Sequence, residues 1–142
     1  MRWHGELSLR PATTADLIWL EATFIAAFLG FAGLTEPKLR AAFRDEIDLD
    51  VTDVIVADGT AVGYIVVEDH AEFWFVEMFV IAPAHQNRGI GTAVLEQVMD
   101  DAPVPLQLTV RKENPAARAL YERLGFRAIG GDEQRTRMEW RW

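Results

Sequence analysis

The chain contains no cysteine among its 142 residues. Disulfide bonds, cysteine nucleophiles and zinc sites built on thiolates are therefore excluded. Its three histidines, His4, His70 and His85, lie too far apart to have the spacing of a metal-binding motif. We therefore expect no metal site, and any chemistry has to use other side chains or the backbone.

Long apolar runs and positive charge are scarce as well. The apolar run at residues 73–82 is about half as long as a membrane span requires, and the first nine residues lack the apolar core of a secretion signal. The formal net charge of −8 disfavours nucleic acid as a partner, because phosphate binding depends on clustered Lys and Arg. The expectation is a cytoplasmic protein that binds neither membrane nor nucleic acid.

The charges are distributed unevenly along the chain. Residues 1–83 hold 5 Lys or Arg and 14 Asp or Glu, a net charge of −9, whereas residues 84–142 hold 9 and 8, a net charge of +1. An anionic ligand held by the second half, with the acidic first half facing a cationic amine, would account for this split. The alternative is a solvated acidic surface, which we favour for the acidic residues between positions 45 and 50.

Length and hydrophobic content predict one domain, residues 1–142, that buries roughly two thirds of its unfolded surface. The hydrophobic periodicity predicts an order of strands and helices. Strands are expected at 6–10, 53–57, 62–68, 73–81, 106–110, 126–129 and 136–142, and helices at about 14–29, 35–47, 92–101 and 115–124. Without further information this order predicts an α/β domain with a mixed sheet.

The strand at 73–81 is apolar on both faces except for Glu77, which predicts a central strand that is covered on both sides. Phe75 and Phe79 flank Glu77 on its own face, so we expect its carboxylate to be desolvated. Desolvation would raise the pKa of Glu77 toward the range of a general base or amine anchor. The alternative is a structural carboxylate that a neighbouring arginine or backbone group satisfies.

After this strand comes the loop Gln86-Asn87-Arg88-Gly89-Ile90-Gly91, followed by a helical pattern. Glycines let the backbone approach an anion closely, and the free N–H groups of a first helical turn point toward it. Two glycines alone are more often a tight turn. The loop also lacks the Lys-Ser/Thr of a P-loop and the third glycine of a dinucleotide fingerprint.

Two segments together resemble the GCN5-related N-acetyltransferase (GNAT) family. Residues 80–91 are similar to its acetyl-CoA signature, an apolar strand end, x-Pro, then Q/R-x-x-G-x-G/A. Residues 114–126 are similar to its second cofactor segment, N-x-x-A-x-x-x-Y-x-x-x-G-F. The resemblance implies a three-layer α/β fold, with a central, mixed but mostly antiparallel sheet of about seven strands and helices on both faces. The strands that end at Ala82 and Val110 would be parallel and splay apart around the pantetheine arm.

The resemblance also implies residue roles. Tyr121 matches the general acid of the family, whereas its periodicity alone favours a core residue. Thr109 stands where the branch that acetylates ribosomal proteins has a glutamate base, which argues against membership of that branch. Asn114 would bond the cofactor further along. Backbone groups of Phe79, Val80 and Ile81 would hold the pantetheine, and the acetyl-CoA diphosphate would bind at Asn87, Arg88, Gly89, Ile90, Gly91 and Thr92. Gln86 and Tyr121 would also contact the cofactor.

The implied activity is acetyl transfer from acetyl-CoA to a primary amine of a small molecule or peptide, directly within a ternary complex. A domain that binds acyl-CoA without catalysis, as a sensor or interaction module, is the alternative. The loop at 30–35 carries no pattern that identifies the acceptor. The five tryptophans are compatible with a core role, with an acceptor pocket and with a homodimer face.

Overall fold

The computed structural model describes residues 2–142, with Ala32 described without its side chain. The described residues form seven strands and four α-helices. The strands are β1 (Leu7–Pro11), β2 (Thr52–Ala57), β3 (Thr60–Asp69), β4 (Trp74–Ile81), β5 (Leu106–Arg111), β6 (Arg127–Gly131) and β7 (Arg135–Trp140). The helices are α1 (Leu17–Phe28), α2 (Glu36–Glu46), α3 (Ile90–Asp101) and α4 (Pro115–Arg123). The predicted element order is confirmed.

The strands form one mixed sheet in the order β1-β2-β3-β4-β5-β7-β6. β4 is the fourth of the seven, as predicted for the central strand. Its residues Trp74 to Val76 pair in parallel with Leu106 to Leu108 of β5, whereas β1–β2, β2–β3, β5–β7 and β6–β7 are antiparallel. Contacts divide the chain into a first unit, residues 1–66 and 78–91, and a second unit, residues 67–77 and 92–142.

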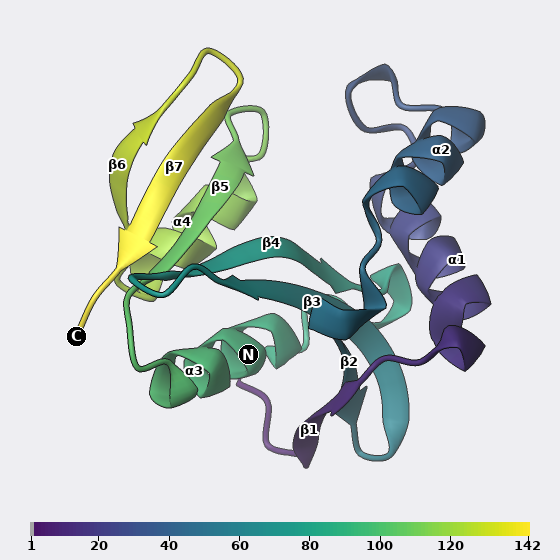
Figure 1. Cartoon of the computed structure of the whole chain (residues 1–142), viewed down its shortest axis with the longest axis horizontal. Helices are drawn as coiled ribbons and strands as arrows, with labels where there is room; N and C mark the ends of the chain where they lie inside the picture. The colour runs from purple at the N-terminus through teal and green to yellow at the C-terminus, as the bar shows by residue number, and fades with distance from the viewer. Residues whose placement is uncertain (1) are drawn as a thin grey trace. The chain divides into compact units, whose positions relative to one another are not determined.

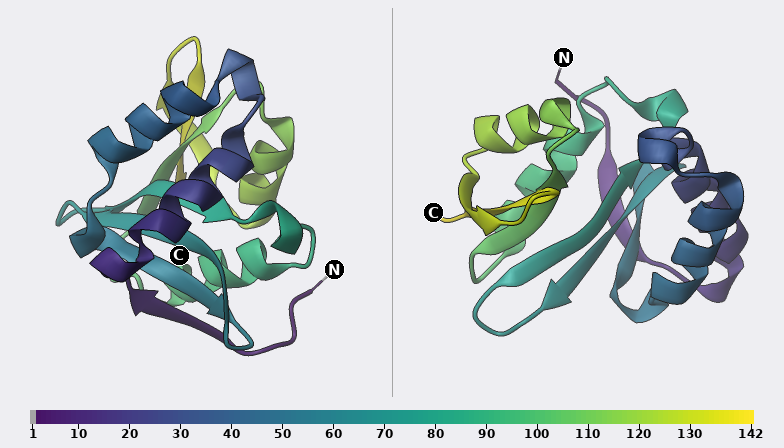
Figure 2. Two further views of the ribbon diagram at one scale, coloured as in Figure 1. Left: turned by 90° about the vertical axis from the view of Figure 1, so that its right-hand side faces the viewer. Right: turned by 90° about the horizontal axis from the view of Figure 1, so that it is seen from above.

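The core of the first unit lies between two helices and one face of its strands. α1 and α2 run side by side in Figure 1, and the right-hand view of Figure 2 shows both along the β1–β3 strands. Their apolar stripes meet side chains of alternating strand positions, as amphipathic elements must to bury one face. The buried cluster consists of Leu20, Phe24, Leu39, Phe43, Val54, Tyr64, Val66 and Val80.

The turn between β2 and β3 follows the predicted hairpin signal. Asp58 and Gly59 have φ values of 50° and 79°, as a two-residue turn with a left-handed backbone requires. A register shift between Ile55 and Val56 then leaves an extra residue in β3, because Ile55 faces Gly63 whereas Val56 faces Ala61. Gly63 therefore sits at a β-bulge.

Gly63 also lies against the backbone of β4, which yields a stability prediction. A Cβ atom at Gly63 would lie 2.1 Å from the carbonyl oxygen of Val80 and 3.0 Å from the Cα of Ile81, so the two strands would have to separate. We expect Gly63→Ala to lower the free energy of unfolding by about 2–4 kcal/mol, measured by urea denaturation.

The matched control for this prediction is Gly130→Ala, a strand glycine in β6 with no heavy atom within 4 Å of the built Cβ. It should leave the free energy of unfolding within about 0.5 kcal/mol of the wild type. An equal, small effect at both positions would show that β3 and β4 tolerate separation at Gly63.

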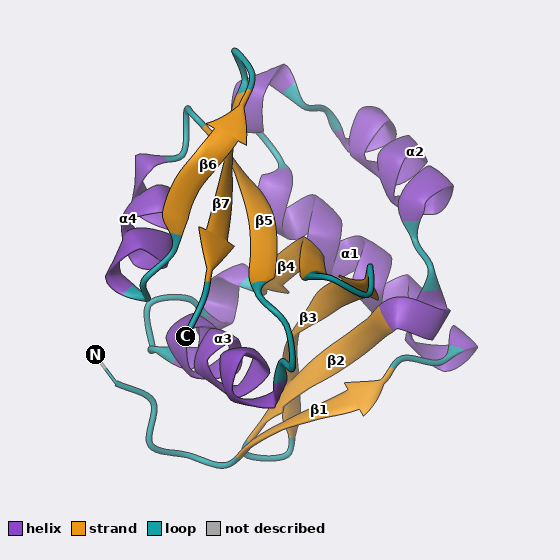
Figure 3. Ribbon diagram, turned by 60° about the vertical axis from the view of Figure 1, so that its left-hand side comes forward, coloured by secondary structure: helices purple, strands orange, loops and turns teal. Residues whose placement is uncertain are grey.

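The second unit packs its strands against α4. Figure 3 shows β5, β7 and β6 as neighbouring strands with α4 beside them. The β5 residues Leu106, Leu108 and Val110 are buried, as their alternation predicted, and Met138 of β7 is buried with them. α4 ends at a left-handed Gly125, φ 101°, which agrees with its predicted role as the helix cap.

Two details of the prediction were wrong. The closing hairpin has the three-residue loop 132–134 rather than a loop from 130 to 135, because Gly130, Gly131 and Arg135 extend the strands. In β4 only Val76 and Val80 are buried, and Glu77 is exposed. The strand is therefore not covered along both of its faces, although its composition predicted that it would be.

Candidate functional site

The predicted anion loop of the first unit is braced against the end of β4. After Ala82, whose N–H donates to the Val62 carbonyl at 2.8 Å, residues 83–85 form one turn of 3₁₀ helix. The Gln86 side-chain amide then donates to the carbonyl oxygen of Ile81 at 2.9 Å. Gln86 thus ties the loop to the strand, which is an internal role that its place in the motif did not reveal.

The loop backbone bends through left-handed conformations. Asn87 has a φ of 62° and Gly89 a φ of 81°. Asparagine and glycine are the residues that adopt this region most readily. The bend brings the chain from the 3₁₀ turn to the start of α3 at Ile90, whose side chain is buried at 1% exposure. A buried anchor at the first helical residue fixes the position of the helix N-terminus.

The start of α3 has the properties of an anion site. The first N–H groups of any helix have no partner within the helix, and the helix dipole adds positive potential there. A Cβ atom at Gly91 would lie 3.5 Å from the Phe79 ring and 3.9 Å from Ile81, so the first turn packs closely on β4. The same strand residues that were predicted to hold a ligand tail therefore support the helix start.

Arg88 is the only cationic side chain in the segment from Gln86 to Gly91. Its guanidinium lies 5.1 Å from the ring centroid of Trp3, and its Nη1 is 3.1 Å from Nδ1 of His85. The Trp3 ring packs closely on the backbone of Gly5, since a Cβ atom at Gly5 would lie 2.4 Å from that ring. Sequence reasoning did not find Trp3, because nothing in the local pattern links it to the loop.

In the second unit, Asn114 is the N-cap of α4. Its side-chain oxygen accepts a hydrogen bond from the N–H of Ala117 at 3.2 Å, which stabilises the first helical turn. The predicted role toward a cofactor therefore has to use the remaining amide N–H groups or the backbone of Asn114. Thr92, the last residue of the predicted diphosphate group, is half-buried in the first turn of α3.

Tyr121 lies in the last turn of α4 and is half-buried. Its ring packs against Phe126 at a centroid distance of 5.8 Å in an edge-to-face arrangement. Burial raises the pKa of Tyr121 above its usual value, because desolvation disfavours the phenolate. The hydroxyl therefore stays protonated at neutral pH and retains a proton that it can donate.

The expected desolvation of Glu77 is wrong, because the residue is exposed on β4. Its neighbours Phe75 and Phe79 are half-buried themselves and do not enclose the carboxylate. The argument that burial makes Glu77 basic therefore fails, whereas its use as an amine anchor stays a prediction. Thr109 is half-buried on β5 and pairs with Arg137 of β7.

Residues 2–142 also bear on metal binding and membrane insertion. No group of three or more His, Asp or Glu residues in this range has an arrangement that could hold a metal ion. None of the helices in the same range combines the length and the apolar character needed to cross a bilayer.

The sequence and fold together assign the chain to a family. The model of the acetyltransferase (GNAT) family matches residues 17–126, and the chain belongs to that family. This confirms the resemblance of the two motif segments, and with it the expected fold class.

Individual relatives agree with this assignment. The chain is 36% identical over 102 residues, 67% of its length, to N-alpha-acetyltransferase RimI of Mycobacterium tuberculosis. It is 31% identical over 116 residues, 76% of its length, to the [ribosomal protein bS18]-alanine N-acetyltransferase of Escherichia coli K12. The matched regions span 65% and 64% of these relatives. The PaiA N-acetyltransferase of Thermoplasma acidophilum, solved with coenzyme A, has the same fold, with a TM-score of 0.80, 18% identity and coverage of 96% and 99% of the two chains.

Proposed function

We propose that the chain is an acetyl-CoA-dependent N-acetyltransferase that acetylates a primary amine of a small molecule or peptide. The observation that carries this proposal is the left-handed loop at Asn87 and Gly89 that opens α3, within a chain that the family model matches over residues 17–126. Family membership supports the activity, and the loop at the start of a helix supports binding of an anionic cofactor there.

The residues of the loop fit a diphosphate. Glycine at 89 and 91 keeps side chains away from the backbone, and the N–H groups from Ile90 to Thr92 begin a helix without intrahelical partners. Arg88 adds one positive charge. In this proposal Asn87 to Thr92 bind the diphosphate, and the backbone of Phe79, Val80 and Ile81 binds the pantetheine. Asn114 binds further along the cofactor.

The proposed reaction uses two side chains of the protein, Glu77 and Tyr121. Acetyl-CoA supplies the acetyl thioester, and a C–N bond to the amine replaces its C–S bond. Glu77 anchors the amine, whose proton passes to the carboxylate or to water. Tyr121 donates its phenolic proton to the leaving thiolate and regains one from solvent, so the free thiol and the amide are the products. No cysteine is present to carry the acetyl group, which supports direct transfer.

Release of free thiol from acetyl-CoA across a panel of primary amines tests the activity. We expect amine-dependent release, with equal amounts of thiol and N-acetylated product detected by mass spectrometry. Tight binding of coenzyme A without turnover of any amine would instead support a non-catalytic acyl-CoA sensor. A wild-type protein that gives no heat with millimolar coenzyme A in calorimetry would contradict both readings.

A smaller effect is expected from the N-terminal segment. Trp3 restrains Arg88 through a cation–π contact, which is worth about 0.5–1 kcal/mol at an exposed site. Trp3→Leu should therefore raise the KM for acetyl-CoA about 2–5-fold and leave kcat unchanged, whereas Trp3→Phe should keep most of the wild-type KM. A loss of kcat instead would show that Trp3 has a wider role than holding Arg88.

A further inference from the structure

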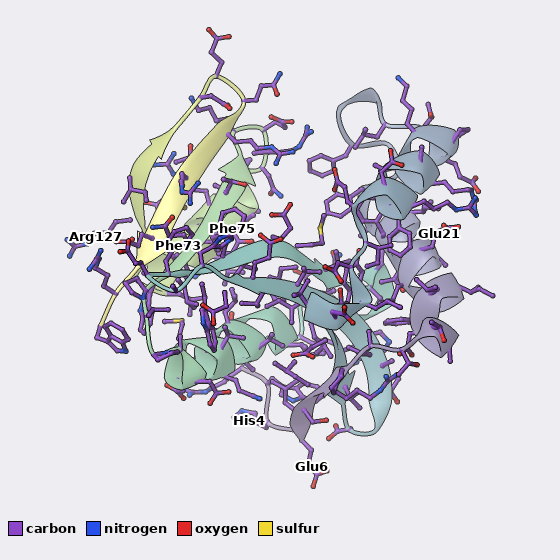
Figure 4. All side chains as sticks on the ribbon, in the orientation of Figure 1. His4, Glu6, Glu21, Phe73, Phe75 and Arg127 are labelled. Carbon is purple, nitrogen blue, oxygen red and sulfur yellow. The ribbon has the colours of Figure 1, made fainter. Side chains whose placement is uncertain are left out.

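Arg137 occupies a defined place on the open face of the second unit. It pairs with Thr109 across β7 and β5, so the two side chains share a face. Its Nε and Nη2 donate to the Gln107 side-chain oxygen at 2.8 and 2.5 Å. Its guanidinium carbon lies 5.6 Å from the ring centroid of Phe73 and 5.1 Å from that of Phe75; both rings are labelled in Figure 4.

The contacts of Arg137 fix the position of its guanidinium. Both hydrogen bonds end on the neutral amide oxygen of Gln107, and both ring contacts are made to uncharged phenylalanines. The nearby carboxylate of Glu139 attracts Arg137 electrostatically, whereas its hydrogen bonds come from Gln107 and from Arg141. A half-buried guanidinium on two aromatic rings, oriented by an amide, is a rigid fork that suits a carboxylate.

Charge on the same face favours an anion too. Strand register places Arg111 and Arg135 opposite each other, and Arg127 opposite Glu139. Together with Arg137 this face carries four arginines against two glutamates, Glu139 of β7 and Glu77 of β4. Arg111 is paired with Glu113 at 2.8 Å, which leaves a positive excess. A polyamine would bring further positive charge toward this face, so the electrostatics disfavour it as acceptor.

The spacing along β4 between Phe75 and the proposed amine anchor Glu77 indicates the size of the ligand. Phe75, which lies beneath Arg137, is two residues before Glu77 on β4, a step of about 7 Å. A ligand with hydrogen bonds to both Glu77 and Arg137 would span such a gap if its amine and carboxylate were attached to one carbon. An α-amino acid has this arrangement, and its side chain would meet the apolar surface of Phe73 and Phe75.

We propose that the acceptor is a free α-amino acid whose carboxylate binds Arg137. This inference rests on the proposed acetyltransferase function, because it places the amine at Glu77. Acetylation then consumes an α-amino acid and acetyl-CoA and yields the N-acetyl amino acid and coenzyme A. Arg137 is the residue that distinguishes a free carboxylate from an amide or a peptide bond.

The test compares glycine, alanine, leucine and phenylalanine with their primary amides, together with spermidine and a peptide that begins with alanine. In the wild type we expect kcat/KM to be at least about 10-fold higher for the acid than for the amide. Arg137→Gln should lower kcat/KM for the acid about 30–100-fold and change that for the amide less than about 3-fold. Arg137→Lys should recover part of the loss, since it keeps the charge without the fork.

Arg123→Gln is the matched control, because Arg123 is an exposed arginine at the end of α4 in the same unit. It should keep the wild-type ratio between acid and amide. The amide has a less basic amine, but this difference cancels when the ratio is compared between variants at one pH. An acid-to-amide ratio that Arg137→Gln leaves unchanged would overturn the proposal, as would faster turnover of spermidine or of the peptide than of every amino acid.

Failure of this inference can be separated from failure of the proposed function. Binding of coenzyme A alone, measured by calorimetry, reports on the loop at Gly89 and not on Arg137. Calorimetric binding of leucine and leucinamide to the protein saturated with coenzyme A gives the same comparison without turnover. We expect leucine to bind at least about 10-fold more tightly than leucinamide, and equal affinities would refute the role of Arg137 even if acetyl transfer is confirmed.

Discussion

Replacement of Gly89 by valine is expected to raise the Kd for coenzyme A at least about 100-fold. Gly89 has a φ of 81°, and a β-branched residue there costs roughly 1–2 kcal/mol of strain. Relief of that strain would turn the loop N–H groups away from the diphosphate. Each charge-assisted hydrogen bond lost costs about 1.5–3 kcal/mol, so the loss of two accounts for the expected change. Isothermal titration calorimetry measures the affinity directly.

Two further variants separate strain from the loss of ligand space. Gly59 has nearly the same backbone angle, φ 79°, in the β2–β3 turn, with no heavy atom within 4 Å of a built Cβ. Gly59→Val should therefore lower stability without changing the Kd for coenzyme A. Gly89→Asn removes most of the strain, because asparagine tolerates the left-handed region, but it still places a side chain in the space proposed for the diphosphate. If Gly89→Val bound coenzyme A as tightly as the wild type, the diphosphate could not lie at this loop.

Local patterns were sufficient to predict the element order. The Asp58-Gly59 pair predicted the hairpin because few residues other than glycine, asparagine and aspartate adopt its backbone angles. Gly125 predicted the end of α4 for a related reason. The β5 alternation identified its buried face, since neighbouring side chains in a strand point to opposite sides. Each of these features depends on residues that are adjacent in the sequence.

Contacts between distant residues could not be predicted in this way. Trp3 meets Arg88 because the N-terminal segment passes the loop in space, and no spacing in the sequence encodes that approach. Asn114 carried a motif role, but its side-chain oxygen caps its own helix. The exposure of Glu77 was missed because apolar residues on both sides of a strand do not establish that another element covers them.

Replacement of Tyr121 by phenylalanine is expected to lower kcat about 100-fold or more, within the range that general acid catalysis contributes. The variant keeps the ring that packs against Phe126, so the helix and the Kd for coenzyme A should be unchanged. A lower kcat at constant affinity is the result that distinguishes proton donation from a packing role. Steady-state thiol release and calorimetry with coenzyme A measure the two quantities separately.

The pH profile gives this prediction a second, independent readout. Because burial raises the pKa of Tyr121, its hydroxyl should remain a proton donor well into the alkaline range. The wild-type rate should therefore rise with pH as the acceptor amine loses its proton, and fall only when the tyrosine ionises; the Phe variant should lack the falling limb. Tyr64→Phe, at the other tyrosine of the chain, is the matched control and should keep both limbs. If Tyr121→Phe retained the wild-type kcat and pH profile, the proton for the thiolate would have to come from another group.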